Sequence, residues 1–149
     1  MEKNGRERFA VRKLIAAMMM LALLACMFIP SVSFTEDRDT VLLARAIYAL
    51  GKDEDYATKL ALGSVVMNRV ESPWFADTLG EVLADQQQFP TGRRYDDESL
   101  QAAHDLISGA RALDAGALYY QYVDSTAWSD ADLVSCSGSY NFYSDKGVL

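Results

Sequence analysis

An uncharged apolar run near the N-terminus limits how much of this 149-residue chain is available to form a domain. The run covers residues 14–30, follows a head with five Lys or Arg residues, and precedes the small residues Ser31-Val32-Ser33. This order is typical of a secretory signal peptide. Because the run is slightly short for a membrane span of about 20 residues, we expect cleavage rather than a permanent anchor. Residues 1–33 are therefore predicted to be a signal peptide, with an N-terminal membrane anchor as the alternative, and residues 34–149 a single domain.

The same segment has a third interpretation at Cys26. Leu23-Leu24-Ala25-Cys26 resembles the lipobox in which a bacterial cysteine is lipidated, but the following residues stay apolar where lipoproteins usually turn polar. We therefore expect Cys26 to lie within a signal helix. The protein is predicted to be exported to an extracellular or cell-wall location, with membrane association through residues 14–30 or lipidation at Cys26 as alternatives.

Charge and cysteine content narrow the classes of partner. Removing five basic and two acidic residues from totals of 14 and 21 leaves 9 basic and 19 acidic residues, a net charge of −10. That charge argues against nucleic acid, which is bound through Lys and Arg patches, and against electrostatic adhesion to anionic membranes or wall polymers. Cys136 is the only cysteine in residues 34–149, so packing rather than an intramolecular disulfide must stabilise the domain.

Apolar residues at three- and four-residue spacing predict two long helices. The first covers residues 41–50 and is capped by Asp39 or Thr40. The second covers residues 56–70, and its broad apolar face predicts that it is the central buried helix. Gly63 in its interior indicates a close approach of a neighbouring element.

The rest of the chain changes from helical to strand-forming character. Thr78 and Glu81 have the spacing of a capping box and predict a short helix to about residue 85. Asp97 is expected to cap a fourth helix. Strand-forming residues follow at 118–123 and 140–143, and a Ser/Asp-rich loop is expected between them. Helices first and a small antiparallel sheet last predict an α+β fold.

His104 is the only histidine of the chain, on a predicted helix face with Leu100 and Ile107. A lone histidine makes a metal site only with further ligands, and no cluster of Cys, His or Asp surrounds it. We expect a partly buried structural role for His104, and we predict neither a metal nor a cofactor.

Short motifs along the predicted domain occur in a characteristic order. They are ARAIYA at 44–49, Gly63 with SVVMNRV at 64–70, Ser72-Pro73 with Phe75, Gln88-Phe89, Glu98-Ser99-Leu100 with Ala102-Ala103, Gly116-Ala117-Leu118-Tyr119, and Gly138 with Phe142-Tyr143. Together they resemble the SleB/CwlJ cell wall hydrolases, known for lysis of the spore cortex. The resemblance implies a small helix-rich lysozyme-like domain with a short C-terminal antiparallel sheet. It also implies cleavage of the glycan backbone of peptidoglycan, as a glycosidase or lytic transglycosylase, so the expected partners are glycan strands.

One position departs from the resemblance where the chemistry is most sensitive. The family's catalytic residue is the glutamate of its Y-A-E-A motif, and the ungapped equivalent here is Leu50. A general acid must give a proton to the departing glycosidic oxygen, which leucine cannot do. Loss of such an acid typically costs about 10²–10⁴ in rate.

Glu54 is the candidate substitute acid, because it matches a second glutamate of the family pattern. It follows Leu50 by four residues, so the two side chains share a face if the helix continues for one more turn. The plainer interpretation is a solvated acidic turn, with the helix ending at Gly51. The sequence thus leaves open a hydrolase that uses Glu54, a degenerate hydrolase, and a non-catalytic protein that binds peptidoglycan or a partner on the same scaffold. An anchored surface protein ranks below these.

Four residues are predicted to contact the substrate. Gln88, Phe89 and Tyr119 lie on matched motif positions, and Tyr140 stands where the resemblance places the histidine of G-N-H-x-F-Y. Further aromatic residues are candidates for stacking on sugar rings, although strand spacing assigns half of the tyrosines to the core: Tyr119, Tyr120, Tyr122, Trp74 and Trp128. The oligomeric state is not indicated by the sequence.

Overall fold

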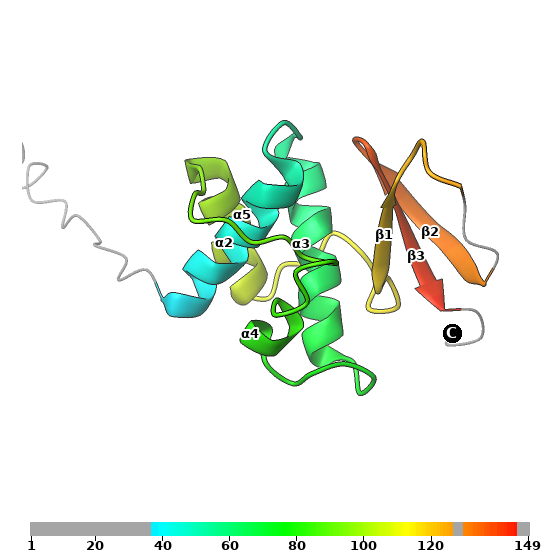
Figure 1. Cartoon of the computed structure of the whole chain (residues 1–149), viewed down its shortest axis with the longest axis horizontal. Helices are drawn as coiled ribbons and strands as arrows, with labels where there is room; N and C mark the ends of the chain where they lie inside the picture. Colours follow the sequence, from blue (N-terminus) through cyan, green and yellow to red (C-terminus); the bar gives the residue numbers. More distant parts are fainter. Residues whose placement is uncertain (1–36, 127–129, 146–149) are drawn as a thin grey trace, which may run out of the picture. The chain divides into compact units, whose positions relative to one another are not determined.

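The computed structural model describes residues 37–126 and 130–145 (Figure 1). The predicted signal peptide at residues 1–33, including Cys26, lies outside these residues, as does Trp128. Within the described ranges no helix has the length and apolar character needed to span a membrane.

Helices precede strands along the described chain (Figure 1). The elements are α2 (Arg38–Gly51), α3 (Tyr56–Glu71), α4 (Leu79–Val82), α5 (Asp97–Ile107), β1 (Tyr119–Tyr122), β2 (Ala131–Ser137) and β3 (Tyr140–Asp145). The strands form an antiparallel sheet in the order β1-β3-β2, so β3 is its central strand. This arrangement confirms the expected α+β fold.

The helix α3 is the central helix, as predicted. It contacts α2, α4 and α5, and it also reaches β1 and β2. Gly63 explains how α2 and α5 come so close to it, because a methyl group at this position would overlap the side chains of Leu106 and Ile47. The expectation of a close approach at Gly63 is confirmed.

The starts of α2 and α5 differ from the predictions by one to three residues, whereas α3 begins at Tyr56 as predicted. α2 begins at Arg38, with Asp37 at the N-cap position, rather than at residue 41. Asp96, not Asp97, caps α5, because its side chain accepts a hydrogen bond from the main-chain N of Ser99 at 2.7 Å. An Asp-Asp pair offers two equivalent caps to sequence reasoning, and the main-chain geometry selects the first.

Thr78 caps α4, as its spacing to Glu81 predicted, but the Glu81 carboxylate accepts its hydrogen bond from the Thr78 hydroxyl, whereas a full capping box uses the main-chain N–H. Thr78 Oγ1 accepts a hydrogen bond from the main-chain N of Glu81 at 3.4 Å and donates to Glu81 Oε2 at 2.6 Å. The helix ends at Val82, earlier than the expected residue 85.

The strand β2 occupies the segment that was expected to be a loop. It pairs with β3 from Ala131↔Asp145 to Ser137↔Tyr140, with an irregularity between Leu133 and Ser135. Most of its side chains are exposed, and Asp and Ser residues interrupt any alternation of apolar and polar positions. The strand therefore depends on pairing with β3 rather than on burial of its own side chains, and periodicity could not reveal it.

Helices and sheet share one core. The sheet contributes Tyr140 and Phe142 of β3, which lie in the same cluster of buried side chains as Leu43 and Ile47 of α2. Two glycines end elements in the left-handed region: Gly109 follows α5 with φ +102°, and Gly138 turns the chain from β2 into β3 with φ +51°.

Candidate functional site

Two departures from the expected motifs, Leu50 and Tyr140, lie in direct contact. The hydroxyl of Tyr140 donates a hydrogen bond to the main-chain oxygen of Leu50 at 2.7 Å. Leu50 is the penultimate residue of α2, where carbonyl groups have no partner within the helix. Tyr140 thus satisfies an acceptor at the end of α2, while the half-buried Leu50 side chain packs against the core.

Tyr140 is held by aromatic neighbours on several sides. Only 1% of its surface is exposed, and the centroid of its ring lies 4.7 Å from that of Tyr122, 5.7 Å from that of Tyr120 and 6.5 Å from that of Phe142. Burial first, and then a hydrogen bond with Tyr122, raise the pKa of Tyr140 well above its ordinary value. The phenol therefore stays protonated and remains a donor to Leu50 at any physiological pH.

Glu54 lies in the turn between α2 and α3, not on a further turn of α2. The helix ends at Gly51, whose main-chain oxygen accepts a hydrogen bond from the Glu54 N at 3.1 Å. The condition under which Glu54 and Leu50 would share a helix face is therefore not met. The half-buried Glu54 side chain instead turns toward the β2–β3 hairpin, where its Oε2 accepts a hydrogen bond from the main-chain N of Ser139 at 3.3 Å.

A second polar contact joins the same two segments. The hydroxyls of Thr58, in the first turn of α3, and Ser137, at the end of β2, are 2.8 Å apart. Gly138 packs so tightly between them that a methyl group there would overlap Glu54 Oε2 and Thr58 Oγ1. We call this region, formed by Leu50, Glu54, Tyr122, Ser139 and Tyr140, the junction.

Arg69 of α3 contacts residues from several of the motifs. Its Nε donates to the main-chain oxygen of Leu118 at 2.7 Å, and its Nη2 donates to Oε1 of Gln88 at 2.9 Å. The guanidinium also lies over three aromatic rings, 4.7 Å from the Phe75 centroid, 4.8 Å from that of Phe89 and 5.3 Å from that of Tyr119. Burial lowers the pKa of Arg69, whereas the aromatic faces around the guanidinium favour its charged form.

Residues 53–143 match the family model described as Cell Wall Hydrolase. The chain belongs to this family. The match contains Glu54, Gln88, Phe89, Tyr119 and Tyr140, and it begins three residues after Leu50.

Relatives of this cell wall hydrolase family member agree with the assignment. The chain is 31% identical over 90 residues to the spore cortex-lytic enzyme of Halalkalibacterium halodurans, an alignment that covers 56% of this chain and 27% of the relative. The chain therefore matches only about a quarter of that protein's length.

Two solved structures share the fold. The catalytic domain of the SleB protein of Bacillus cereus is similar with a TM-score of 0.64 and 24% identity, over 70% of this chain and 88% of that one. The catalytic domain of the germination-specific lytic transglycosylase SleB of Bacillus anthracis has a TM-score of 0.58 and 24% identity, over 77% and 99% of the two chains. These similarities confirm the predicted helix-rich lysozyme-like fold with a short C-terminal sheet.

The four predicted substrate contacts have different surroundings in this family member. Phe89 and Tyr140 are 0% and 1% exposed, so both rings contribute to packing and present no surface to a ligand. Gln88 is exposed, but its amide oxygen also holds Arg69. Tyr119 is half-buried and its hydroxyl donates to Asp145 Oδ2 at 3.3 Å. All four substrate contacts thus remain predictions, and in this structure Phe89 and Tyr140 contribute to packing.

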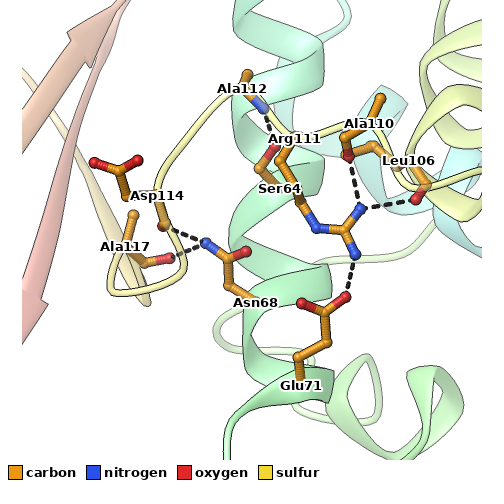
Figure 2. Close-up of polar contacts among 9 residues, drawn as sticks. All are labelled: Ser64, Asn68, Glu71, Leu106, Ala110, Arg111, Ala112, Asp114 and Ala117. Carbon is orange, nitrogen blue, oxygen red and sulfur yellow. Dashed lines mark hydrogen bonds and ion pairs between the residues drawn. The ribbon is translucent and has the colours of Figure 1, made fainter.

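Asn68 was not singled out by sequence reasoning, although it lies beside Arg69 in a matched motif. Figure 2 shows its Nδ2 donating to the main-chain oxygens of Asp114 and Ala117, at 2.8 Å and 3.1 Å. One turn earlier, Ser64 Oγ accepts a hydrogen bond from the main-chain N of Ala112 at 2.9 Å (Figure 2). These polar side chains on α3 fix the loop that leads into β1.

Arg111, near the start of the same loop, also holds it in place. Its Nη1 donates to the main-chain oxygens of Leu106 and Ala110 at 2.8 Å and 2.6 Å, and its Nη2 pairs with Glu71 at the end of α3 (Figure 2). The loop carrying Gly116-Ala117-Leu118-Tyr119 is thereby tied to both α3 and α5.

Lys59 is a buried cation that periodicity could not reveal. Its side chain is 2% exposed, and its Nζ lies 2.5 Å from Glu98 Oε2 and 3.2 Å from Asp96 Oδ2. Burial opposes the charge, but the bonds to Glu98 and Asp96 outweigh it and raise the pKa of Lys59. Lys59 therefore stays charged and joins α3 to the start of α5.

His104 lies half-buried on α5, with its Nδ1 3.7 Å from Asp105 Oδ1. Within the described ranges, no group of three or more His, Cys, Asp or Glu side chains has an arrangement that could hold a metal ion.

Proposed function

We propose that this protein engages the glycan backbone of peptidoglycan outside the cytoplasm, on a cell wall hydrolase scaffold that has lost its general acid. Membership of the family and the similarity to a spore cortex-lytic enzyme support the choice of ligand. The basic head and apolar run of residues 1–33 support export. In this proposal the domain holds a glycan strand without cutting it.

The observation that carries the proposal is the contact between Leu50 and Tyr140. Leucine has no proton to transfer, and the end of α2 where an acid would be needed is packed and bonded to Tyr140. Glu54 is engaged elsewhere, because its carboxylate accepts a hydrogen bond from Ser139 and lies against Gly138. In this proposal the junction holds Leu50 where the resemblance places the acid, and Glu54 does not take its place.

A second candidate function is glycan cleavage with Glu54 as the acid. Glu54 is half-buried and lies in the connection that directly follows α2, four residues after Leu50, and this position favours a role as the acid. Catalysis would require Glu54 to leave the Ser139 N–H and turn a protonated carboxyl toward the glycosidic oxygen.

Release of soluble muropeptides from purified peptidoglycan separates the two functions. The full chain should be compared with Leu50→Glu, Glu54→Gln and the control Asp53→Asn, whose side chain is 84% exposed. We expect no release from the wild type and measurable release from Leu50→Glu, since Tyr140 bonds to the main chain of residue 50 whichever side chain it carries.

Release by the wild type that Glu54→Gln abolishes and Asp53→Asn preserves would instead establish the second function. Release by the wild type that none of these substitutions changes would contradict both.

A further inference from the structure

The structure separates the aromatic residues that were candidates for sugar stacking. Tyr119 is half-buried under Arg69, and the hydroxyl of Tyr120 donates to the main-chain oxygen of Gln88. Two of the described candidates remain well exposed, Tyr122 at 56% and Trp74 at 73%. Of these, Tyr122 belongs to the junction, whereas Trp74 lies in the loop between α3 and α4.

Tyr122 is fixed in place although it is exposed. It pairs with Tyr140 across β1 and β3, so the two side chains stand on the same face of the sheet. Their ring centroids are 4.7 Å apart with an interplanar angle of 31°, so one face of Tyr122 packs on Tyr140 and the remaining surface is open to solvent. Tyr140 in turn is held by Leu50 and by the edge-on ring of Tyr120.

A rigid aromatic ring beside polar groups suits a particular class of ligand. A pyranose ring has an apolar face of C–H groups, and an exposed tyrosine offers a flat apolar surface on which that face can stack. The Glu54 carboxylate accepts a hydrogen bond from the main-chain N of Ser139, the residue before Tyr140, so a polar group also belongs to the junction. Nucleic acid bases also stack on aromatic rings, but a chain with net charge −7 repels a phosphate backbone.

We propose that Tyr122 is a carbohydrate-stacking residue that binds an N-acetylated sugar ring of the glycan strand, and that Tyr140 positions it. This inference rests on the proposed function and names the surface that performs it. Tyr140 departs from the family motifs and is then the support of a binding surface. Leu50, which also departs from them, provides the main-chain oxygen that holds Tyr140.

Titration of the full chain with an N-acetylglucosamine tetrasaccharide, together with sedimentation on purified peptidoglycan, tests the inference. We expect Tyr122→Ala and Tyr122→Leu to raise the Kd about tenfold, because both remove the flat ring, and Tyr122→Phe to stay within about twofold. Trp74→Ala is the matched control, an exposed aromatic residue outside the junction, and should bind like the wild type.

Wild-type affinity in both Tyr122→Ala and Tyr122→Leu would overturn the inference while leaving the proposed function intact. Loss of binding in Trp74→Ala with unchanged binding in the Tyr122 variants would also overturn it, by placing the sugar on the other loop. A wild type that binds neither the tetrasaccharide nor peptidoglycan would overturn the proposed function and the inference together.

Discussion

At the scale of single residues, the hydroxyl of Tyr140 is the group whose removal best tests the structure of the junction. Tyr140→Phe keeps the ring contacts but leaves the main-chain oxygen of Leu50 without its donor. We expect the free energy of unfolding to fall by about 1 kcal/mol, the usual net value of one such hydrogen bond. Urea denaturation measures the change. Tyr48→Phe is the control, since the Tyr48 hydroxyl has no hydrogen-bond partner in the described part of the chain, and an equal loss in both variants would contradict the assigned bond.

Tyrosine ionisation predicts how stability depends on pH. Burial raises the pKa of Tyr120 to about 12, a hydrogen bond to Asp105 and then burial raise that of Tyr56 to about 12, and the pKa of Tyr140 is also raised. Unfolded tyrosines lose their protons near pH 10. Above that pH, proton release lowers the free energy of the unfolded state relative to the folded state. This contribution to stability is complete below about pH 10 and is lost as the pH rises toward 12.

Urea denaturation at a series of pH values from 8 to about 11 checks this expectation. The free energy of unfolding should fall with rising pH above about 10, and the fall should be shallower in Tyr140→Phe, which removes one of the three groups. A wild-type stability that stays constant across this interval would show that these phenols are not protected in the folded state.

The sequence indicated Leu50 and Tyr140 as departures from the motifs, but not that they touch. They are 90 positions apart, and their contact depends on how the β2–β3 hairpin docks on the end of α2. The same is true of Arg69, whose partners come from separate segments of the chain. Motif spacing identified which residues matter, and only the packing shows which of them support one another.

At the scale of elements, the crossing of α3 with α2 and α5 depends on Gly63. Gly63→Ala would force a methyl group against Leu106 and Ile47, so we expect a loss of about 1–3 kcal/mol in the free energy of unfolding. Gly80→Ala is the control, because nothing lies within 4 Å of a methyl group at that position of α4. Alanine should be neutral or slightly stabilising there. Thermal or urea unfolding of both variants measures the difference. A Gly63→Ala variant as stable as the wild type would contradict the close crossing.

The helices were predictable to within a few residues and β2 was not, for a physical reason. The contacting faces of α2, α3 and α5 are apolar because these helices pack against one another. Their apolar residues therefore recur at helical spacing, which can be recognised in the sequence. β2 is an edge strand with mostly exposed side chains, held by main-chain pairing with β3. Polar residues such as Asp132 and Ser135 are tolerated at such an edge. They remove the alternation of apolar and polar residues by which a strand is recognised in a sequence.

At the scale of the whole domain, Arg69 joins the central helix to the sheet and to the loop after α4. The planar guanidinium of Arg69 donates to both Leu118 and Gln88 and lies over aromatic rings. The ammonium group of a lysine cannot make all of these contacts. We expect Arg69→Lys to lower the free energy of unfolding by about 1.5–3 kcal/mol, the range for hydrogen bonds to charged groups. Arg94→Lys, at an exposed position, should change it by less than about 0.5 kcal/mol. Equal stability of the two variants in urea would contradict the role given to Arg69.

The proposed whole-molecule account is a hydrolase architecture used to hold a glycan strand. In this chain α3 is the central helix, Arg69 connects it to the segment that leads into β1, and Asn68 and Arg111 hold the loop before that strand. At the junction, Leu50 and Tyr140 join α2 to β3.

The most direct test of that account is a single incubation of the wild-type full chain with purified peptidoglycan. The protein that sediments with the polymer and the muropeptides that appear in the soluble fraction are measured together. The account predicts that the protein sediments and that the soluble fraction contains no more muropeptide than a sample without protein. Soluble muropeptides released by the wild type would contradict it.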